Sequence, residues 1–458
     1  MKKTNKRNMT FNKINTLMAA LLVVIICCMK LLSMWNSKTE LDYFNEHVLK
    51  GKEYMEQSCY VEAIQEFKKA DLVKGDENVN VAIAECYLGL GDYTSFKTCS
   101  DHIRNTYGTN EKLYQYIAYY HAHMNDSYNE IQILKEGVAF YPECEALKEK
   151  YDAVKGKYTQ AGYYSDQVVY MGHQYIIVAS EGKETVMNAT LGKVGDKEYE
   201  KVYDISEDKC VQDMWQDTQM LYSAKADGRV SYYDSMGYKR KSPDKQYAFL
   251  GAPRDGYALV QSQEGWGYID GEFNELGEWF EDATAFSEGM AAVKCDGKWA
   301  FVDKDFNYIT EFEYEGVVMD EFKCCSKAGV AFAQKSGSYV LVGIDGEMDM
   351  DEDYSQAKGF SSKKDYAAVK TADGWKLIDV KGNTVEAVDC DELCSSSNGI
   401  APFKKGDSWG YIGVDDGVYV EATFDGVTPV NKNGYGAIKT DQQWRFIGFS
   451  RFQVNQGL

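Results

Sequence analysis

Phe286-Ser-Glu-Gly-Met-Ala-Ala-Val-Lys-Cys-Asp-Gly-Lys-Trp-Ala-Phe-Val-Asp303 is the stretch of this 458-residue sequence that decides its fold. It contains two short runs of β-branched, small and aromatic residues with Asp, Gly and Lys between them. Such runs predict two antiparallel strands joined by a tight turn. Side chains two apart on a strand share a face, so this hairpin has an apolar face to bury.

Both halves of this stretch recur along the chain in one register. The aromatic position of the second half falls at 266, 299, 339, 375, 409 and 444, with spacings of 33, 40, 36, 34 and 35 residues. The Gly-x-Ala-x-Val half begins about ten residues earlier each time and has the same spacings. Two motifs that keep a constant separation while the length of the unit varies indicate a repeat unit. Weaker copies at 229–234 and 174–178 raise the number of units from six to seven or eight.

The repeats predict a β domain over residues 160–458. Each unit is expected to be an antiparallel meander, and one meander cannot bury its apolar face alone, so neighbouring units must stack. An open superhelix and a closed propeller both satisfy this requirement. A unit of roughly 35 residues is short for a four-stranded blade, which favours the open or partly curled array.

The double motif resembles the WG-repeat family of bacterial proteins. The family unit reads roughly Phe-x-Glu-Gly-x-Ala-x-Val, followed by Gly-Lys-Trp-Gly-Tyr-Ile-Asp-x-x-Gly, and residues 286–303 are the closest copy. The resemblance covers about two thirds of the chain. The family often has proline near the third strand, whereas this chain has Thr310-Glu311 or Glu386-Ala387, which leaves the geometry of that turn open.

Residues 40–156 have a different, helical pattern. Gly51, Ala84 and Ala118 are 33 and 34 residues apart, and aromatic and small residues follow them at similar offsets. This period resembles the tetratricopeptide (TPR) family, and an amphipathic stretch from Glu143 to Tyr158 is expected to cap the stack. The resemblance implies a concave face that binds a peptide. A rigid spacer is the alternative.

The N-terminus predicts a membrane segment. Residues 1–16 are basic and are expected to be a cytosolic tail, and the apolar residues 17–35 are expected to form a transmembrane signal anchor. This orientation makes the chain a single-pass membrane protein with its bulk outside the cytoplasm. A cleaved signal peptide and a cytosolic orientation are the alternatives.

Charge and cysteine content restrict the partners. The formal net charge of −21 repels phosphate backbones, which excludes nucleic acid and leaves basic or neutral partners. The twelve cysteines are scattered and form no CxxC pair, so neither a zinc site nor a disulfide framework is indicated. A bond between Cys390 and Cys394 stays open.

No pattern in the sequence predicts catalysis. Four of the five histidines fall in the helical region and only His173 in the β domain, and no hydrolase, metalloprotease or nucleotide-binding motif is present. Residues 349–353 resemble the start of a calcium loop but lack its later Gly and Glu, so a solvated acidic hairpin is expected. We therefore expect no catalytic, cofactor-binding or metal-binding residues, and no cofactor.

These observations predict a multidomain protein, α then all-β, that is not an enzyme. Its expected function is that of a membrane-anchored scaffold for protein–protein interaction at the bacterial cell surface, with other proteins or peptides as partners. The alternative is a cell-wall or glycan-binding surface protein that uses its repeated aromatic residues. Solvent-exposed tryptophans at the repeat positions would favour that alternative.

Overall fold

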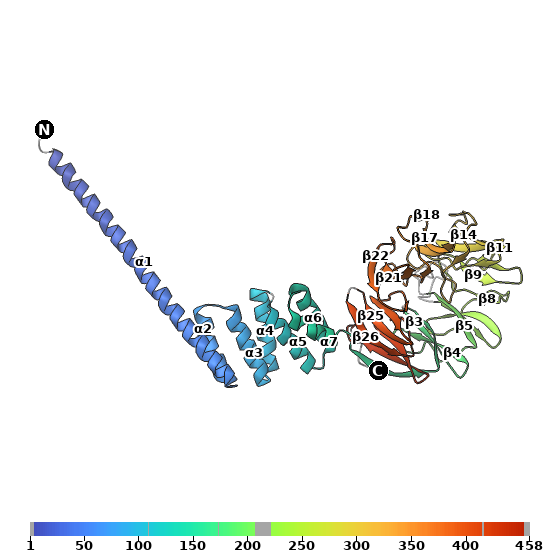
Figure 1. The fold of residues 1–458 in the computed structure, drawn as a ribbon, viewed down its shortest axis with the longest axis horizontal. Helices are drawn as coiled ribbons and strands as arrows, with labels where there is room; N and C mark the ends of the chain where they lie inside the picture. Colours follow the sequence, from blue (N-terminus) through green and yellow to red (C-terminus); the bar gives the residue numbers. More distant parts are fainter. Residues whose placement is uncertain (1–3, 109, 173, 207–220, 415, 453–458) are drawn as a thin grey trace. The chain divides into compact units, whose positions relative to one another are not determined.

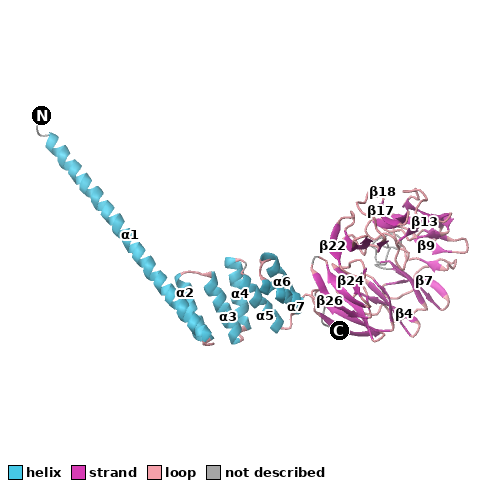
Figure 2. Ribbon diagram, viewed as in Figure 1, coloured by secondary structure: helices cyan, strands magenta, loops and turns pink. Residues whose placement is uncertain are grey.

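The computed structural model describes residues 4–108, 110–172, 174–206, 221–414 and 416–452. It divides into two compact units, residues 1–151 and 152–458. The first unit is built from helices and the second from strands (Figures 1 and 2). The helices are α1 (Thr4–Glu56), α2 (Tyr60–Val73), α3 (Glu77–Leu90), α4 (Tyr93–Tyr107), α5 (Glu111–His123), α6 (Ser127–Phe140) and α7 (Glu145–Val154).

The predicted basic tail, membrane segment and first repeat helix lie on one continuous helix, α1. Among the described residues, no helical stretch is both long enough and apolar enough to cross a bilayer. The uncharged run from Leu17 ends before Lys30, so at about 1.5 Å per residue it spans roughly 20 Å of a ~30 Å hydrocarbon core. The prediction of a transmembrane anchor over 17–35 is therefore wrong. The single-pass localisation that depended on it is wrong as well.

Helices α1 to α6 pack in sequence as hairpins, and their N-caps repeat. The side chains of Asp76 and Asn110 each accept a backbone N–H at the start of α3 and α5, and these two caps are 34 residues apart. Asp92 and Asp126 cap α4 and α6 in the same way at the same interval. Each cap satisfies N–H groups that the helix itself leaves unpaired. The helical repeat is thus visible in the caps as well as in the core.

Small residues set the distance between the helices of the first hairpin. A Cβ on Gly51 would lie only 2.5 Å from a ring carbon of Phe67, which is itself buried between Ala63 and Ala70. The aromatic ring fills the space that the glycine leaves, which explains why these residue types occur at these positions.

The second unit contains eight antiparallel sheets, which are the blades of a β-propeller (Figure 1). We number the blades in chain order. Blade 1 is β2 (Gln167–Met171), β3 (Tyr175–Ser180) and β4 (Lys183–Asn188), and blade 2 is β5 (Lys201–Ser206), β6 (Leu221–Ala226) and β7 (Arg229–Asp234). Blade 3 is β8 (Phe249–Leu250), β9 (Ala258–Gln261), β10 (Trp266–Ile269) and β11 (Glu275–Phe280), and blade 4 is β12 (Asp282–Ala283), β13 (Met290–Cys295) and β14 (Lys298–Asp303).

The remaining four blades follow the same plan. Blade 5 is β15 (Gly316–Val317), β16 (Val330–Lys335), β17 (Ser338–Gly343) and β18 (Gly346–Glu347), and blade 6 is β19 (Gln356–Ala357), β20 (Ala367–Thr371), β21 (Gly374–Ile378) and β22 (Thr384–Val388). Blade 7 is β23 (Glu392–Leu393), β24 (Ile400–Lys405), β25 (Ser408–Gly413) and β26 (Gly417–Phe424). Blade 8 is β27 (Gly426–Val427), β28 (Tyr435–Thr440) and β29 (Gln443–Phe449), completed by β1 (Tyr158–Ser165).

The pairing of β1 with β29 closes the ring. The first strand of the unit lies antiparallel to the last, from Tyr158 opposite Phe449 to Ser165 opposite Trp444. A buried apolar cluster then lies between each pair of neighbouring blades, including one between blades 8 and 1 that contains Phe446 and Ile176. Each blade therefore buries both faces, which the stacking argument requires.

Of the two predicted arrangements, the closed propeller is correct and the favoured open array is wrong. Roughly 35 residues suffice because the first strand of each blade from blade 3 to blade 8 has only two residues. The weaker repeats are also real. Residues 229–234 form β7, and residues 174–178 overlap β3, which corresponds to the Gly-x-Ala-x-Val strand of the other blades.

Truncation of Phe446 to alanine tests the closure. Its side chain is fully buried in the cluster between blades 8 and 1, so we expect a loss of about 3–5 kcal/mol, seen as a lower urea midpoint in circular dichroism. Tyr308→Ala, at an exposed position of blade 4, is the control and should change the midpoint little. Equal midpoints for Phe446→Ala and wild type would contradict the closed ring.

Candidate functional site

The repeated aromatic residues are part of the framework of the propeller. Trp299 and Trp375 are only 5% and 2% exposed, and the aromatic residues at 266, 339, 409 and 444 are half-buried. In blades 4, 6, 7 and 8 a lysine lies directly opposite the tryptophan on the neighbouring strand. In blades 4 and 6 this lysine lies over the ring, with its ammonium 6.0 and 5.7 Å from the ring centre. None of the six repeat positions therefore offers an exposed aromatic surface.

The aspartate at the end of the Trp-x-Tyr-Ile-Asp motif forms a turn. Oδ1 of Asp270, Asp303 and Asp379 accepts two backbone N–H groups, two and four residues later. Hydrogen bonds from Asn307 hold the pKa of Asp303 below its ordinary value. Burial raises the pKa of Asp270 and Asp379, but the hydrogen bonds to their carboxylates outweigh it, so that both pKa values are lowered.

The same kind of turn builds two neighbouring loops on blades 1 and 2. Oδ1 of Asn188 accepts the N–H groups of Thr190 and Gly192, and Oδ1 of Asp234 accepts those of Met236 and Tyr238. The second oxygen of Asp234 pairs with Arg240 at 2.7 Å. Both loops are thereby fixed by hydrogen bonds within themselves.

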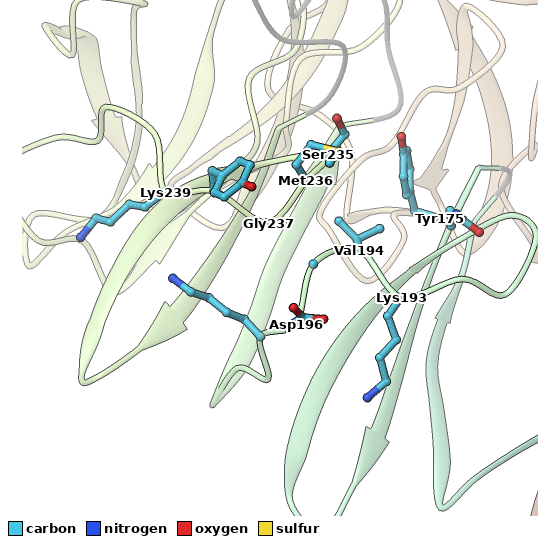
Figure 3. A pocket seen from close by; sticks show the side chains of 12 residues that line it. Tyr175, Lys193, Val194, Asp196, Ser235, Met236, Gly237 and Lys239 are labelled. Carbon is cyan, nitrogen blue, oxygen red and sulfur yellow. The ribbon is translucent and has the colours of Figure 1, made fainter.

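An open pocket of about 620 Å³ lies between these two loops (Figure 3). The loops touch where Gly195 meets Gly237, because a Cβ on Gly195 would lie 2.8 Å from the carbonyl oxygen of Met236. Both glycines have a positive φ, which favours glycine at this contact. The pocket is lined by Tyr175, Asn188, Lys193, Val194, Gly195, Asp196, Lys197, Ser235, Met236, Gly237, Tyr238 and Lys239.

The rim of this pocket carries two exposed apolar side chains. Met236 is 64% and Tyr238 is 67% exposed, more than any other large apolar side chain in the described part of residues 152–458. Tyr308, on the corresponding turn of blade 4, is 55% exposed but does not line the pocket. We take this pocket with its rim as the candidate binding site.

A second unusual feature is a long connection in blade 5. The segment Asp320–Lys327, which we call the bridging segment, joins β15 to β16 and reaches residues of other blades. The Phe322 ring lies 4.4 Å from that of Tyr170 in blade 1, and the N–H of Ala285 in blade 4 donates to the Lys323 carbonyl at 2.7 Å. The bridging segment thus connects three blades.

Buried charges accompany the bridging segment. Arg254 makes two hydrogen bonds to the Asp204 carboxylate, from Nη1 at 2.5 Å and from Nη2 at 2.7 Å, and both side chains are buried. Within the bridging segment, Lys327 Nζ lies 2.6 Å from Asp320 Oδ2. Burial raises the pKa of Asp320, but Lys327 and backbone N–H donors outweigh it, so that this pKa is lowered. The Arg254–Asp204 pair joins blades 3 and 2, whereas the Asp320–Lys327 pair lies within the bridging segment of blade 5.

The other residues considered in the sequence do not converge on a site. His47 pairs with Glu66 at 2.5 Å, His121 pairs with Asp126 at 3.0 Å, and His123 stacks on Tyr93 in the helical unit. His173 lies outside the described residues. Among the residues that the structure describes, no group of three or more His, Cys, Asp or Glu side chains is arranged to hold a metal.

Residues 349–353 do not form the expected hairpin: they lie in the connection between β18 of blade 5 and β19 of blade 6, where Glu352 pairs with Lys376 at 2.7 Å. Cys390 and Cys394 are both free thiols, so the pairing left open by the sequence is not formed.

Sequence reasoning missed both the pocket and the bridging segment, although each left a signal. The pocket forms between the two weakest repeats, whose turns keep an Asn or Asp at the motif's last position. The bridging segment lies in the one unit with a spacing of 40 residues, where the others have 33 to 36. Both features therefore lie where the sequence departs from the repeat.

Comparison with known proteins supports the repeat. Residues 266–299 match the model of a family described as WG containing repeat, so the chain is a repeat protein with a WG repeat. That match runs from the tryptophan of blade 3 to the tryptophan of blade 4, which is one full unit. No match is found among curated proteins.

Three solved structures are similar at low identity. PorZ, an essential surface component of the type-IX secretion system of Porphyromonas gingivalis, is 9% identical with a TM-score of 0.32, over 62% of this chain and 42% of that one. The extracellular domain of a putative one component system from B. thetaiotaomicron is 10% identical with a TM-score of 0.33, over 65% and 43%.

The AfRom2 CNH domain is 9% identical with a TM-score of 0.30, over 64% and 96%. The chain spans less than half the length of the first two structures. At these TM-scores the similarities carry no argument about function.

Replacement of Arg254 by methionine tests the buried pair. It would leave the Asp204 carboxylate buried without its partner, so we expect a loss of about 3–5 kcal/mol in urea unfolding. The double variant Arg254→Met with Asp204→Leu removes both charges and should recover a large part of that loss. A single variant as stable as wild type would contradict the assigned pairing.

Acid titration tests the aspartate turns. Because the folded pKa of Asp270, Asp303 and Asp379 is lowered, their stabilisation is present above the unfolded pKa of about 3.9 and is lost as pH falls through the folded values. The triple Asp→Asn variant keeps an acceptor oxygen, as Asn188 shows, but has no charge to lose. We therefore expect its melting temperature to fall less than that of wild type between pH 4 and pH 2.

Asp373→Asn, at an exposed hairpin position, is the control for this titration and should follow wild type. If the melting temperatures of wild type and the triple variant fall equally between pH 4 and pH 2, the charges of these carboxylates do not stabilise the fold.

Proposed function

We propose that this chain is a non-enzymatic scaffold that binds other proteins, and that its propeller does so at the pocket between blades 1 and 2. The observation that carries this proposal is the combination of an open pocket with two exposed apolar side chains, Met236 and Tyr238, on its rim. Burial of such side chains against a partner is favourable, and aromatic and methionine side chains are enriched where proteins meet.

The rigidity of the site supports this proposal. The two loops are fixed by the turns of Asn188 and Asp234, and they belong to blades that are held in a closed ring. A surface that is ordered before binding loses little conformational entropy when the partner docks. A rigid propeller with a variable loop region is therefore suited to recognition.

The helical unit is a second candidate surface. Its three hairpins and the final helix have the 33- and 34-residue period that resembles TPR proteins, and small residues such as Gly51 allow the helices to pack closely. A TPR assignment would imply that a peptide binds along this array. The proposal places no part of the chain in a membrane.

No observation favours the glycan-binding alternative. That hypothesis required exposed aromatic residues at the repeat positions, and all six are buried or half-buried. The net charge of −21 also disfavours nucleic acid as a partner. Protein is the partner class that best fits the rim of the pocket.

Site-specific photo-crosslinking tests the proposal. A photoreactive phenylalanine analogue is placed at Tyr238, or at Tyr308 as a matched exposed control, in the full chain expressed in its native cells. We expect discrete protein adducts from position 238 and none of the same mass from position 308, because only Tyr238 lines the pocket. Adducts that are identical at both positions, or absent from both, would refute a binding site at this pocket.

A further inference from the structure

We infer that the pocket between blades 1 and 2 binds an acidic segment of a partner protein in which a carboxylate side chain lies beside an apolar one. This inference rests on the proposed function and adds the chemistry of the partner. It follows from three features of the pocket: its unpaired cations, its apolar rim and its limited size.

The cations are the first feature. Lys193, Lys197 and Lys239 line the pocket, against a single acidic side chain, Asp196. Within the described part of the chain, none of these three lysines lies within 4.0 Å of a carboxylate, and the ammonium of Lys197 is 5.3 Å from the centre of the Tyr233 ring. Many other lysines of the propeller are paired, including Lys225, Lys245, Lys323, Lys335, Lys358 and Lys376.

Three unpaired lysines are notable in a chain with a net charge of −21. Acidic side chains are abundant in this chain, yet no carboxylate of the described residues, Asp196 included, lies within 4.0 Å of these three ammonium groups, which leaves their charge available to a ligand. Figure 3 shows Lys193 from blade 1 and Lys239 from blade 2 on either side of Asp196. Because each ammonium ends a flexible four-carbon stem, these side chains can turn over the opening when a carboxylate enters.

The apolar rim is the second feature. Met236 and Tyr238 alternate with Gly237 and Lys239 along one loop, so Lys239 has an apolar neighbour, Tyr238. A ligand that contacts both needs an acid next to an aliphatic or aromatic side chain. A methionine side chain adapts its shape to such a neighbour, which suits a short peptide.

The limited size of the pocket is the third feature. Together with the negative charge of the surrounding surface, it favours a short anionic ligand over a long one. A pocket of about 620 Å³ takes a few side chains. A long polyanion would extend beyond the three lysines over a surface whose net charge repels it. A single acidic side chain of a peptide can pair with the lysines of the pocket without extending over the acidic surface. The ligand that fits the pocket is therefore a short peptide segment.

Selection from a random heptapeptide library displayed on phage tests the inference with the full chain as bait. We expect the wild type to enrich peptides that carry Asp or Glu beside an aliphatic or aromatic residue. The Lys193→Gln/Lys239→Gln variant should lose this enrichment. Lys381→Gln, an exposed lysine on the corresponding turn of blade 6, should keep it. These side chains are exposed, so melting temperatures equal to wild type are expected and are checked first.

Fluorescence anisotropy on one enriched peptide gives the magnitude. We expect the peptide with Asn and Gln in place of its acids to bind at least about tenfold more weakly, and the affinity of the acidic peptide to fall as salt rises. Peptides without acids, enrichment that survives in the double lysine variant, or no enrichment at all would overturn the inference. If protein adducts form at position 238 but any of these results is found, the protein-binding site stands and only the acidic nature of its ligand is refuted. If no adducts form at position 238, the proposed function itself is refuted.

Discussion

The pairing of β1 with β29 is the interaction on which the rest of the propeller depends. Every blade is apolar on both faces, so a row of blades would leave one face of blade 1 and one of blade 8 in water. β1 pairs with a strand almost three hundred positions later and brings Ile176 and Met187 against Phe446. At about 25 cal/mol per Å² of apolar surface, covering two such faces is a large part of the stability of the ring.

In the closed ring the repeated residues pack between the blades or form their turns, so their side chains are not available to a partner. Trp266, Trp299 and Trp375 each pack under a lysine, and the aspartates at the end of the motif hold the following turn. Asn188 and Asp234 show that the turn persists even where the rest of the motif is lost. Under the proposed function, recognition depends on the positions that differ between the blades, such as the loops of blades 1 and 2.

The bridging segment is a second departure from the repeat, and it contacts other blades. Its extra residues bring Phe322 against Tyr170 and place an ion pair, Asp320 with Lys327, near Arg254 and Asp204. Buried ion pairs contribute little net stability, but the loss of one partner is costly, so they enforce one arrangement of the blades. The Phe322–Tyr170 ring contact and the hydrogen bond from Ala285 to Lys323 join the bridging segment of blade 5 to blades 1 and 4, and the Arg254–Asp204 pair joins blades 3 and 2.

Local patterns in the sequence predicted the units well and their assembly poorly. The double motif around Trp299 correctly gave two adjacent strands per unit and a total of up to eight units, because hairpin patterns depend on neighbouring residues. The pocket could not be predicted in this way, since Lys193 and Lys239 belong to different blades and to the two weakest repeats. Pairing between distant residues leaves no periodic trace.

The two wrong predictions share a physical cause, which is the use of typical element lengths. A unit of roughly 35 residues is short for a four-stranded blade, which favours the open array, yet first strands of two residues such as β12 make the unit compact enough to close. The anchor prediction takes residues 17–35 as one apolar stretch, whereas Lys30 interrupts that stretch and the uncharged run before it is too short. In both cases the outcome depended on a few residues at the edge of an element. The closure of the ring likewise depends on residues outside the repeats, because β1, which belongs to no repeat, is the strand that pairs with β29.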